Sequence, residues 1–131
     1  LNYRLKNLKK IIEKRRKNVE HYKKYLNPKY VFFPEEKNNQ FNTYHTFVIQ
    51  VDRRNELKRY LQKNNINTAI HYPIPIHLQP AAKLFGYKKG SFKNAERQAK
   101  RILTLPINQF LLETQIKTIS NKINNFYSKN N

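Results

Sequence analysis

The residues best suited to chemistry lie in one proline-rich stretch, His71-Tyr72-Pro73-Ile74-Pro75-Ile76-His77-Leu78-Gln79-Pro80. Its two inner prolines each fix φ at about −65° and lack a backbone donor, and each pushes the preceding residue toward extended geometry. The stretch is therefore predicted to be a stiff extended loop. It carries two imidazoles, a phenol and an amide, on His71, Tyr72, His77 and Gln79, and these groups suit a polar ligand. A proline-rich surface turn without a ligand is the alternative that the spacing leaves open.

Composition and charge limit the kinds of partner. The 131 residues fit one domain with a modest core of its own. Lys and Arg number 27 against 8 Asp and Glu, so the formal net charge is +19. Such a charge is typical of proteins that bind nucleic acid, an anionic membrane surface or a phosphorylated ligand. Because the lysines are spread along the chain and no nucleic-acid motif is present, we favour compositional bias together with a partner that supplies acidic surface.

Several classes of site and location are excluded or disfavoured. Cysteine is absent, which excludes disulfides and thiolate sites. No run approaches the ~18 apolar residues of a membrane span, so a cytoplasmic protein is expected. No Asp, Glu or Cys accompanies the two histidines of the proline-rich stretch, so no metal site is predicted. Because the chain starts at Leu1 and contains no Met, we expect a fragment or a processed product.

The apolar pattern predicts an α+β domain. Apolar residues recur every three or four positions from Leu5 to Leu26, which predicts one long helix over residues 3–26, with Leu5 and Leu8 on the stripe that needs a partner. The other expected elements are an edge strand at 30–33, strands at 44–51 and 66–70, and helices at 52–64, 80–85, from 94 to about 103 and from 113 onward. Gly86 and Gly90 are expected to take positive φ in turns around Tyr87, which either contacts a ligand or simply packs in the turn.

Several ordered blocks give the chain a resemblance to a known family. They are residues 68–80, 84–92 with Asn94-Ala95-Glu96, and 102–107 with Thr114-Gln115-Ile116 after them. In this order and spacing they resemble the C-terminal part of the DegT/DnrJ/EryC1/StrS family of pyridoxal-phosphate (PLP) sugar aminotransferases. Arg15-Arg16 and Tyr22 are similar to the stretch in which the family chain leaves its large domain. The resemblance covers about the whole chain.

The resemblance implies a two-layer α+β small domain of the aspartate-aminotransferase (fold type I) kind. It implies a long N-terminal linking helix at 1–26, and a small domain at 27–131 with a mainly antiparallel sheet and helices on one face. Family members work as dimers, with active sites at the interface. They transfer an amino group from glutamate to a keto-deoxyhexose linked to dTDP or UDP, as in lipopolysaccharide or O-antigen biosynthesis. The implied partners are therefore a large PLP-binding domain or subunit, a second copy and a nucleotide-linked sugar.

The resemblance also assigns residues. The implied substrate contacts are His71, Tyr72, His77, Gln79 and Tyr87. Asn2 resembles the asparagine of an Asn-x-Arg block that reaches a neighbouring subunit's cofactor phosphate. In the family about a helix more of sequence follows that block, so either the match at Asn2 is chance or the chain carries an internal deletion.

No catalytic residue is predicted in this chain. The family's Schiff-base lysine and the partner of its pyridine nitrogen lie in the large domain, and a PLP enzyme needs both. The chain alone is therefore expected to bind no PLP and to lack transaminase activity. Two other readings stay open, a truncated inactive remnant of such an enzyme and a basic nucleic-acid-binding module.

Overall fold

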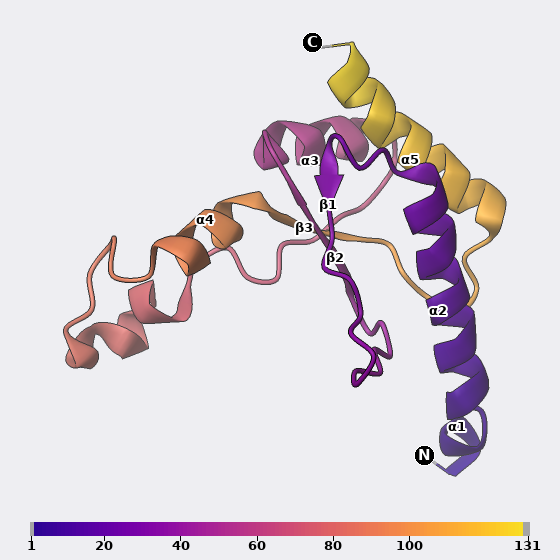
Figure 1. Ribbon diagram of the computed structural model, residues 1–131, viewed down its shortest axis with the longest axis horizontal. Coiled ribbons are helices and arrows are strands. Elements are labelled where there is room, and N and C mark those ends of the chain that lie inside the picture. The colour runs from indigo at the N-terminus through magenta and orange to yellow at the C-terminus, as the bar shows by residue number, and fades with distance from the viewer. Residues whose placement is uncertain (1, 130–131) are drawn as a thin grey trace.

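The computed structural model describes residues 2–129 and has the predicted α+β fold (Figure 1). Its elements in chain order are the helices α1 (Asn2–Lys6) and α2 (Leu8–Tyr25), the strands β1 (Val31–Phe32) and β2 (Phe47–Val51), helix α3 (Arg54–Lys63), the 3₁₀ turns η1 (Ile76–Leu78) and η2 (Pro80–Phe85), helix α4 (Lys93–Arg101), strand β3 (Ile102–Leu105) and helix α5 (Glu113–Ser128). Helices α2 and α5 lie side by side along one side of the molecule, and the sheet lies between them and the η1–α4 region.

The sheet is antiparallel, with β2 at its centre in the order β1-β2-β3. Val31 of β1 pairs with Val51, and β3 pairs with β2 from Phe47↔Leu105 to Gln50↔Ile102. Side chains alternate along β2, so that Phe47, Ile49 and Val51 are buried on one face. That face carries the hydrophobic core, and helices α2, α3 and α5 cover it.

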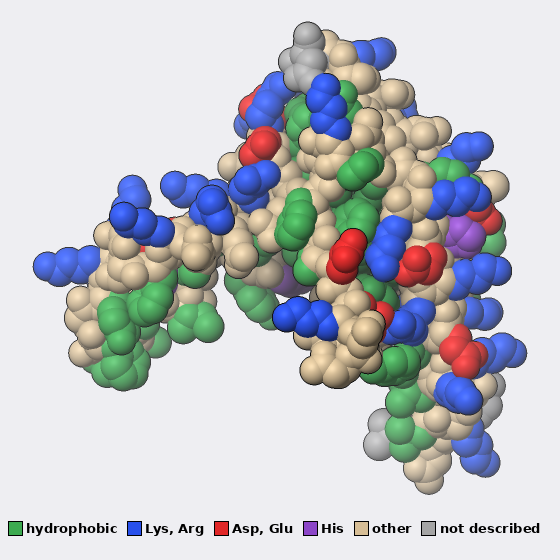
Figure 2. Space-filling model, viewed as in Figure 1, with side chains coloured by type: hydrophobic (Ala, Val, Ile, Leu, Met, Phe, Trp, Pro, Cys, Tyr) green, Lys and Arg blue, Asp and Glu red, His purple; other side chains and the backbone are tan. Residues whose placement is uncertain are grey.

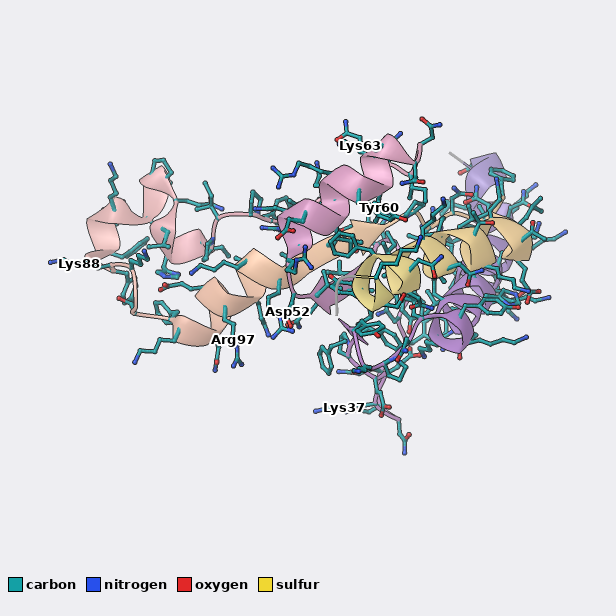
Figure 3. All side chains as sticks on the ribbon, turned by 90° about the horizontal axis from the view of Figure 1, so that it is seen from above. Lys37, Asp52, Tyr60, Lys63, Lys88 and Arg97 are labelled. Carbon is teal, nitrogen blue, oxygen red and sulfur yellow. The ribbon has the colours of Figure 1, made fainter. Side chains whose placement is uncertain are left out.

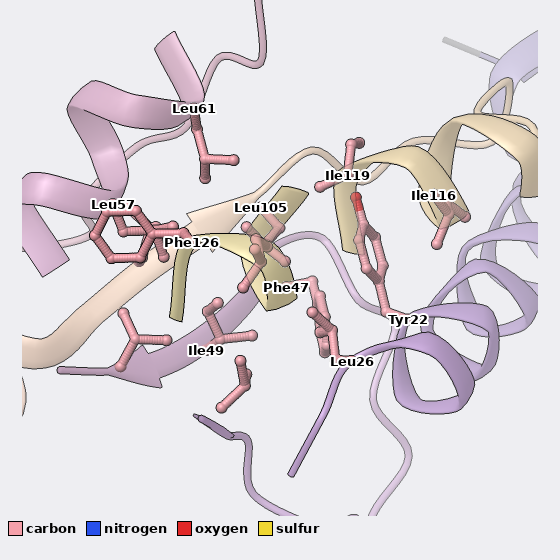
Figure 4. Close-up of a cluster of buried hydrophobic side chains, with 14 of the residues drawn as sticks. Tyr22, Leu26, Phe47, Ile49, Leu57, Leu61, Leu105, Ile116, Ile119 and Phe126 are labelled. Atoms are coloured by element: carbon pink, nitrogen blue, oxygen red, sulfur yellow. The ribbon is translucent and has the colours of Figure 1, made fainter. Parts of the chain in front are cut away.

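The core is centred on an aromatic contact between helix and sheet (Figure 4). The ring of Tyr22 in α2 stacks on Phe47 with centroids 5.2 Å apart, and its hydroxyl donates to the carbonyl oxygen of Pro106 at 2.9 Å. From α5, Ile116, Ile119 and Ile123 complete the same cluster. The tyrosine therefore combines a large buried apolar area with a satisfied polar end.

The C-terminal end of α2 is fastened to α5 by one side chain. Asn124 accepts a hydrogen bond from the backbone N–H of Asn27 at 3.0 Å and donates to the carbonyl of Tyr25 at 2.8 Å. The bond to Tyr25 satisfies a carbonyl that a helix leaves unpaired at its C-terminal end, and the bond from Asn27 holds the residue that follows the helix cap against α5. Helix α1 and the N-terminal end of α2 extend beyond the core (Figure 1), and there Leu5 of α1 and Leu8 of α2 are exposed. The helices formed by residues 2–129 include none that is long and apolar enough to span a membrane.

Residues 71–101, called the arm here, extend away from the helix-covered sheet (Figure 1). The arm contains η1, η2 and α4, and both of its ends meet at one place. There Ala69 and Thr104 form an isolated antiparallel bridge, with N···O distances of 3.1 and 2.8 Å. The arm is thus closed at its base by backbone hydrogen bonds next to the sheet.

The structure corrects five of the predicted elements. The long N-terminal helix is interrupted at Asn7, and the strand predicted at 44–51 begins only at Phe47. Residues 66–70 are no strand, because Asn65 turns at φ 59° and only Ala69 meets β3 before the prolines follow. The stretch predicted to be extended contains the 3₁₀ turn η1, since only the residues directly before its prolines are kept out of helical geometry. Helix α4 ends at Arg101, and the short apolar run 102–105 forms β3 because pairing with β2 outweighs its helical periodicity.

A charged clamp holds the loop that precedes β2. Arg16 of α2 donates to both carboxylate oxygens of Glu36 at 2.8 and 2.7 Å, and to the carbonyl of Asn42 at 2.7 Å. The guanidinium also lies 4.7 Å from the ring centroid of Phe41. The loop reaches outward from the sheet, and Lys37 marks its outer part in Figure 3. Hydrogen bonding to Arg16, followed by the Asn42 N–H, lowers the pKa of Glu36 to about 2.

This lowered pKa predicts an acid-sensitive contribution to stability. The folded state favours the ionised Glu36 carboxylate, so its contribution is complete above the unfolded-state pKa, about 4.5, and disappears as the pH falls toward about 2. We expect Glu36→Gln to lower the melting temperature at pH 6 and to flatten its decline between pH 4.5 and 2. Glu20→Gln, which removes an exposed carboxylate paired with Lys23 on the same helix as Arg16, is the control and should keep the wild-type decline. A Glu36→Gln profile parallel to that of the wild type would contradict the clamp.

Candidate functional site

The five residues predicted to contact a ligand on this domain line one cleft of about 630 Å³ on the arm. They come from separate parts of the arm, namely the proline-rich stretch for His71, Tyr72, His77 and Gln79, and the turn between η2 and α4 for Tyr87. The remaining lining is largely apolar and consists of Ile74, Pro75, Ile76, Ala82, Phe85, Phe92, Ala95, Gln98, Ala99 and Ile102. Figure 2 shows hydrophobic side chains gathered on one side of the arm, with Lys and Arg along the other.

His71 is anchored at the base of the arm. Its Nδ1 lies 2.9 Å from the hydroxyl oxygen of Thr104, a buried β3 residue whose backbone also pairs with Ala69. The structure records no partner for Nε2 of His71 among residues 2–129. The sheet therefore fixes one side of this imidazole and leaves the other nitrogen for a ligand in the cleft.

His77 is held more tightly than His71. Its Nε2 lies 3.0 Å from Oε1 of Glu96, and its side chain is only 7% exposed. The ring also packs against Phe92, with centroids 4.8 Å apart. This histidine therefore forms part of the cleft wall, with one nitrogen already occupied.

Tyr87 is placed by a turn that needs its two glycines. Gly86 ends η2 at φ 73°, and Gly90 has φ 96°, both in a region that other residues seldom adopt. Between them the chain places the Tyr87 ring edge-on to that of Phe92, with ring centroids 5.0 Å apart. The predicted positive φ at both glycines is confirmed, and Tyr87 packs in the turn while it lines the cleft.

Tyr72 and Gln79 lie at two other parts of the cleft. Tyr72 is 72% exposed, so most of its ring is free for contact with another molecule. Gln79 lies between η1 and η2 in extended geometry, and its amide donates to the carbonyl of Ile74 at 3.4 Å. The proline-rich stretch thus bends back on itself, and this bend brings its polar side chains to one opening.

Asn2 does not take part in this cleft. It lies exposed on α1, at the opposite end of the molecule from the arm (Figure 1). Sequence reasoning also missed two residues that shape the cleft, Phe92 and Glu96. Both fall within or beside the blocks quoted above, but nothing in the sequence shows that they meet His77. The described residues contain no group of three or more His, Cys, Asp or Glu that could hold a metal ion.

Comparison with known proteins places this chain in a family. Residues 1–124 match the DegT/DnrJ/EryC1/StrS aminotransferase family. A pleiotropic regulatory protein of Geobacillus stearothermophilus is 34% identical over 130 residues, which are 97% of this chain and 35% of that protein. A dTDP-3-amino-3,4,6-trideoxy-alpha-D-glucose transaminase of Streptomyces venezuelae is 39% identical over 72 residues, which are 55% of this chain and 19% of that enzyme.

Solved structures agree with the sequence matches. The crystal structure of Streptomyces venezuelae DesV in complex with a ketimine intermediate superposes with a TM-score of 0.89 at 28% identity, over 95% of this chain and 34% of that one. A DegT DnrJ EryC1 StrS aminotransferase from Brucella abortus gives a TM-score of 0.87 at 29% identity, over 96% and 34%. The chain thus spans about a third of the length of these proteins. Because the match in sequence extends from Leu1 to Asn124, the chain belongs to the DegT/DnrJ/EryC1/StrS aminotransferase family.

Proposed function

We propose that this chain is the C-terminal domain of a nucleotide-sugar aminotransferase. In the complete enzyme an amino group passes from glutamate to a keto-deoxyhexose linked to dTDP or UDP, as in lipopolysaccharide or O-antigen biosynthesis. The observation that carries the proposal is the cleft, in which His71, Tyr72, His77, Gln79 and Tyr87 face one volume. Two matched transaminases support this substrate class, because one is named for a dTDP-linked amino sugar and another, from Pseudomonas aeruginosa, for a UDP-linked oxo sugar.

The cleft suits the sugar better than the cofactor. PLP needs a lysine for its imine and an acidic partner for its ring nitrogen, and the residues that line the cleft include no Lys, Asp or Glu. The lining residues therefore do not fit a resident PLP. Imidazoles, a phenol and an amide next to apolar walls do fit the hydroxyl groups and the ring of a deoxy sugar.

The remaining parts of the proposal concern the complete enzyme. Residues 1–26 link this small domain, residues 27–131, to a large PLP-binding domain or subunit in the cytoplasm, and this chain is inactive without it. The complete enzyme is a homodimer with active sites at the interface. Asn2 contacts the cofactor phosphate of the neighbouring subunit, a role that suits its exposure on α1, away from the arm.

The test is a titration of this chain with dTDP and with UDP-N-acetylglucosamine, followed residue by residue by NMR. Because the cleft offers only one part of a binding site, we expect weak binding, with a Kd of about 1 mM, or about −4 kcal/mol. Amide signals of residues 71–79 and 86–92 should shift, since these segments line the cleft. Signals from the lysine-rich face of α2 should stay in place.

The salt dependence separates this proposal from polyanion binding. Contacts inside the cleft should persist when NaCl is raised from 50 to 300 mM. A nucleic-acid-binding module would instead bind a 20-nucleotide DNA with an affinity that falls steeply with log salt. Shifts confined to lysines, or binding of DNA but not of dTDP, would overturn the proposed function.

A further inference from the structure

The arm is held together by a polar contact rather than by a large apolar core. Among its described residues only Ala82 and Ala99 are buried hydrophobics, whereas Tyr72, Ile76, Leu84 and Phe85 are exposed. Two small side chains bury too little apolar area to hold three short elements in one geometry. Other interactions must therefore fix the shape of the cleft.

One carboxylate connects η1, the turn after η2 and α4. Glu96, in the first turn of α4, lies 3.0 Å from Nε2 of His77 in η1, and the same oxygen, Oε1, accepts the backbone N–H of Gly90 at 2.7 Å. Its side chain is only 14% exposed. The hydrogen bond from Gly90, followed by that from His77, lowers the pKa of Glu96, so the carboxylate is ionised at neutral pH.

The chemistry of this contact assigns the proton on His77. A carboxylate accepts hydrogen bonds and cannot donate one, so Nε2 of His77 carries the hydrogen and donates it to Glu96. In the neutral ring Nδ1 is then an acceptor, and the structure records no partner for it among residues 2–129. Glu96 thus orients the imidazole. In metal sites, a carboxylate that hydrogen-bonds the other ring nitrogen of a metal-bound histidine orients that ring in the same way.

We infer that Glu96 is a positioning residue, which fixes the His77 ring and the turn bearing Tyr87 so that the cleft is formed before a ligand binds. The part of this inference that concerns ligand binding rests on the proposed function, whereas the contact itself does not. Pre-formed walls reduce the entropy that binding must overcome. A loss of the carboxylate should therefore disorder η1 and the 86–92 turn together.

The experiment uses this chain with three substitutions and needs no ligand for its first readout. Glu96→Ala removes both hydrogen bonds, and Glu96→Gln keeps an acceptor oxygen but no charge. Glu56→Ala is the matched control, because Glu56 also stands in the first turn of a helix, α3, and also has a lowered pKa, owing to its hydrogen bond with Arg53. The readouts are the amide-proton shift of Gly90 from pH 2 to 8 and its hydrogen-exchange rate.

The expected pattern differs between the variants. In the wild type and Glu56→Ala, the Gly90 shift should follow a titration below the ordinary range of glutamate. The titratable side chain in contact with the Glu96 carboxylate is His77, and Lys93 and Lys100 lie one turn before and after Glu96 on α4. All three residues remain in every variant, so a difference between variants reports the substituted glutamate. Glu96→Gln should abolish the acid titration but keep the amide protected, and Glu96→Ala should raise its exchange rate about tenfold or more.

Two results decide between the possible failures. A flat Gly90 shift in the wild type, or unchanged exchange in Glu96→Ala, would overturn the positioning role. If the wild type titrates as expected but neither dTDP nor UDP-N-acetylglucosamine shifts the cleft signals, the contact stands and the proposed function fails. If the wild type shows both the Gly90 titration and ligand-induced shifts of the cleft signals, Glu96→Ala should weaken binding of dTDP at least about tenfold. Glu96→Gln, which keeps an acceptor oxygen, should lose less affinity than Glu96→Ala.

Discussion

Replacing Tyr22 by Ala is expected to lower the free energy of unfolding by about 3–5 kcal/mol, as found for large aromatic truncations in cores. The side chain is fully buried, it stacks on Phe47, and its hydroxyl satisfies the carbonyl of Pro106. The change leaves a cavity between α2 and the sheet and removes the hydrogen bond to the half-buried carbonyl of Pro106. Since small domains are stable by only about 5–15 kcal/mol, much of this domain should unfold in mild denaturant. Urea denaturation followed by circular dichroism measures the loss.

A second substitution separates the two contributions of this tyrosine. Tyr22→Phe keeps the ring and removes only the hydroxyl, so it should cost about 0.5–1.5 kcal/mol, the usual net contribution of one hydrogen bond. Phe32→Ala is the control, because that aromatic ring is 57% exposed on the edge strand and its removal should cost less than about 1 kcal/mol. If Tyr22→Ala were no more destabilising than Phe32→Ala, the described core would be wrong.

Filling the cleft should strongly weaken ligand binding. Ala95 lines the cleft from α4 and is exposed. A larger side chain at this position therefore occupies the cleft and does not disturb the core. We expect Ala95→Trp to weaken binding of dTDP or UDP-N-acetylglucosamine at least about tenfold, or about 1.4 kcal/mol, by steric exclusion. The melting temperature should stay within a few degrees, since alanine to tryptophan on an exposed helical position changes helix propensity by less than about 1 kcal/mol.

The same substitution elsewhere on the arm provides the control. Ala81 is exposed in η2 and does not line the cleft, so Ala81→Trp adds an equal side chain without entering the cleft. It should bind the nucleotide probes as the wild type does. Equal affinities for Ala95→Trp and the wild type would show that the ligand uses another surface. A loss shared by both variants would indicate that binding depends on the general shape of the arm.

Much of the fold could be predicted from local patterns. The 3.6-residue periodicity of Ile116, Ile119 and Ile123 predicts α5, and the alternation of Phe47, Ile49 and Val51 predicts β2, because each element buries one face against the same core. The short apolar run at 102–105 is different, since four residues fit either a helix or a strand. Only its pairing with β2, more than 50 positions earlier in the chain, decides for the strand.

The candidate site divides in a similar way. His71, Tyr72, His77 and Gln79 are close in sequence and lie within two residues of a proline, so their presence in one loop is predictable. The two glycines explain how the chain turns to bring Tyr87 to the same cleft. The contact of Glu96 with His77 was not predictable. It joins residues 19 positions apart through a 3₁₀ turn, a glycine turn and the start of a helix, and no periodic pattern encodes such a path.

The bridge between Ala69 and Thr104 makes the arm a side excursion of the chain rather than a link in its core. The polypeptide leaves the sheet and returns to it at one point, so closing that loop requires only a local backbone contact, whatever happens farther out. Substitutions, insertions or motions at the far end of the arm can therefore occur without disturbing the register of β2 and β3.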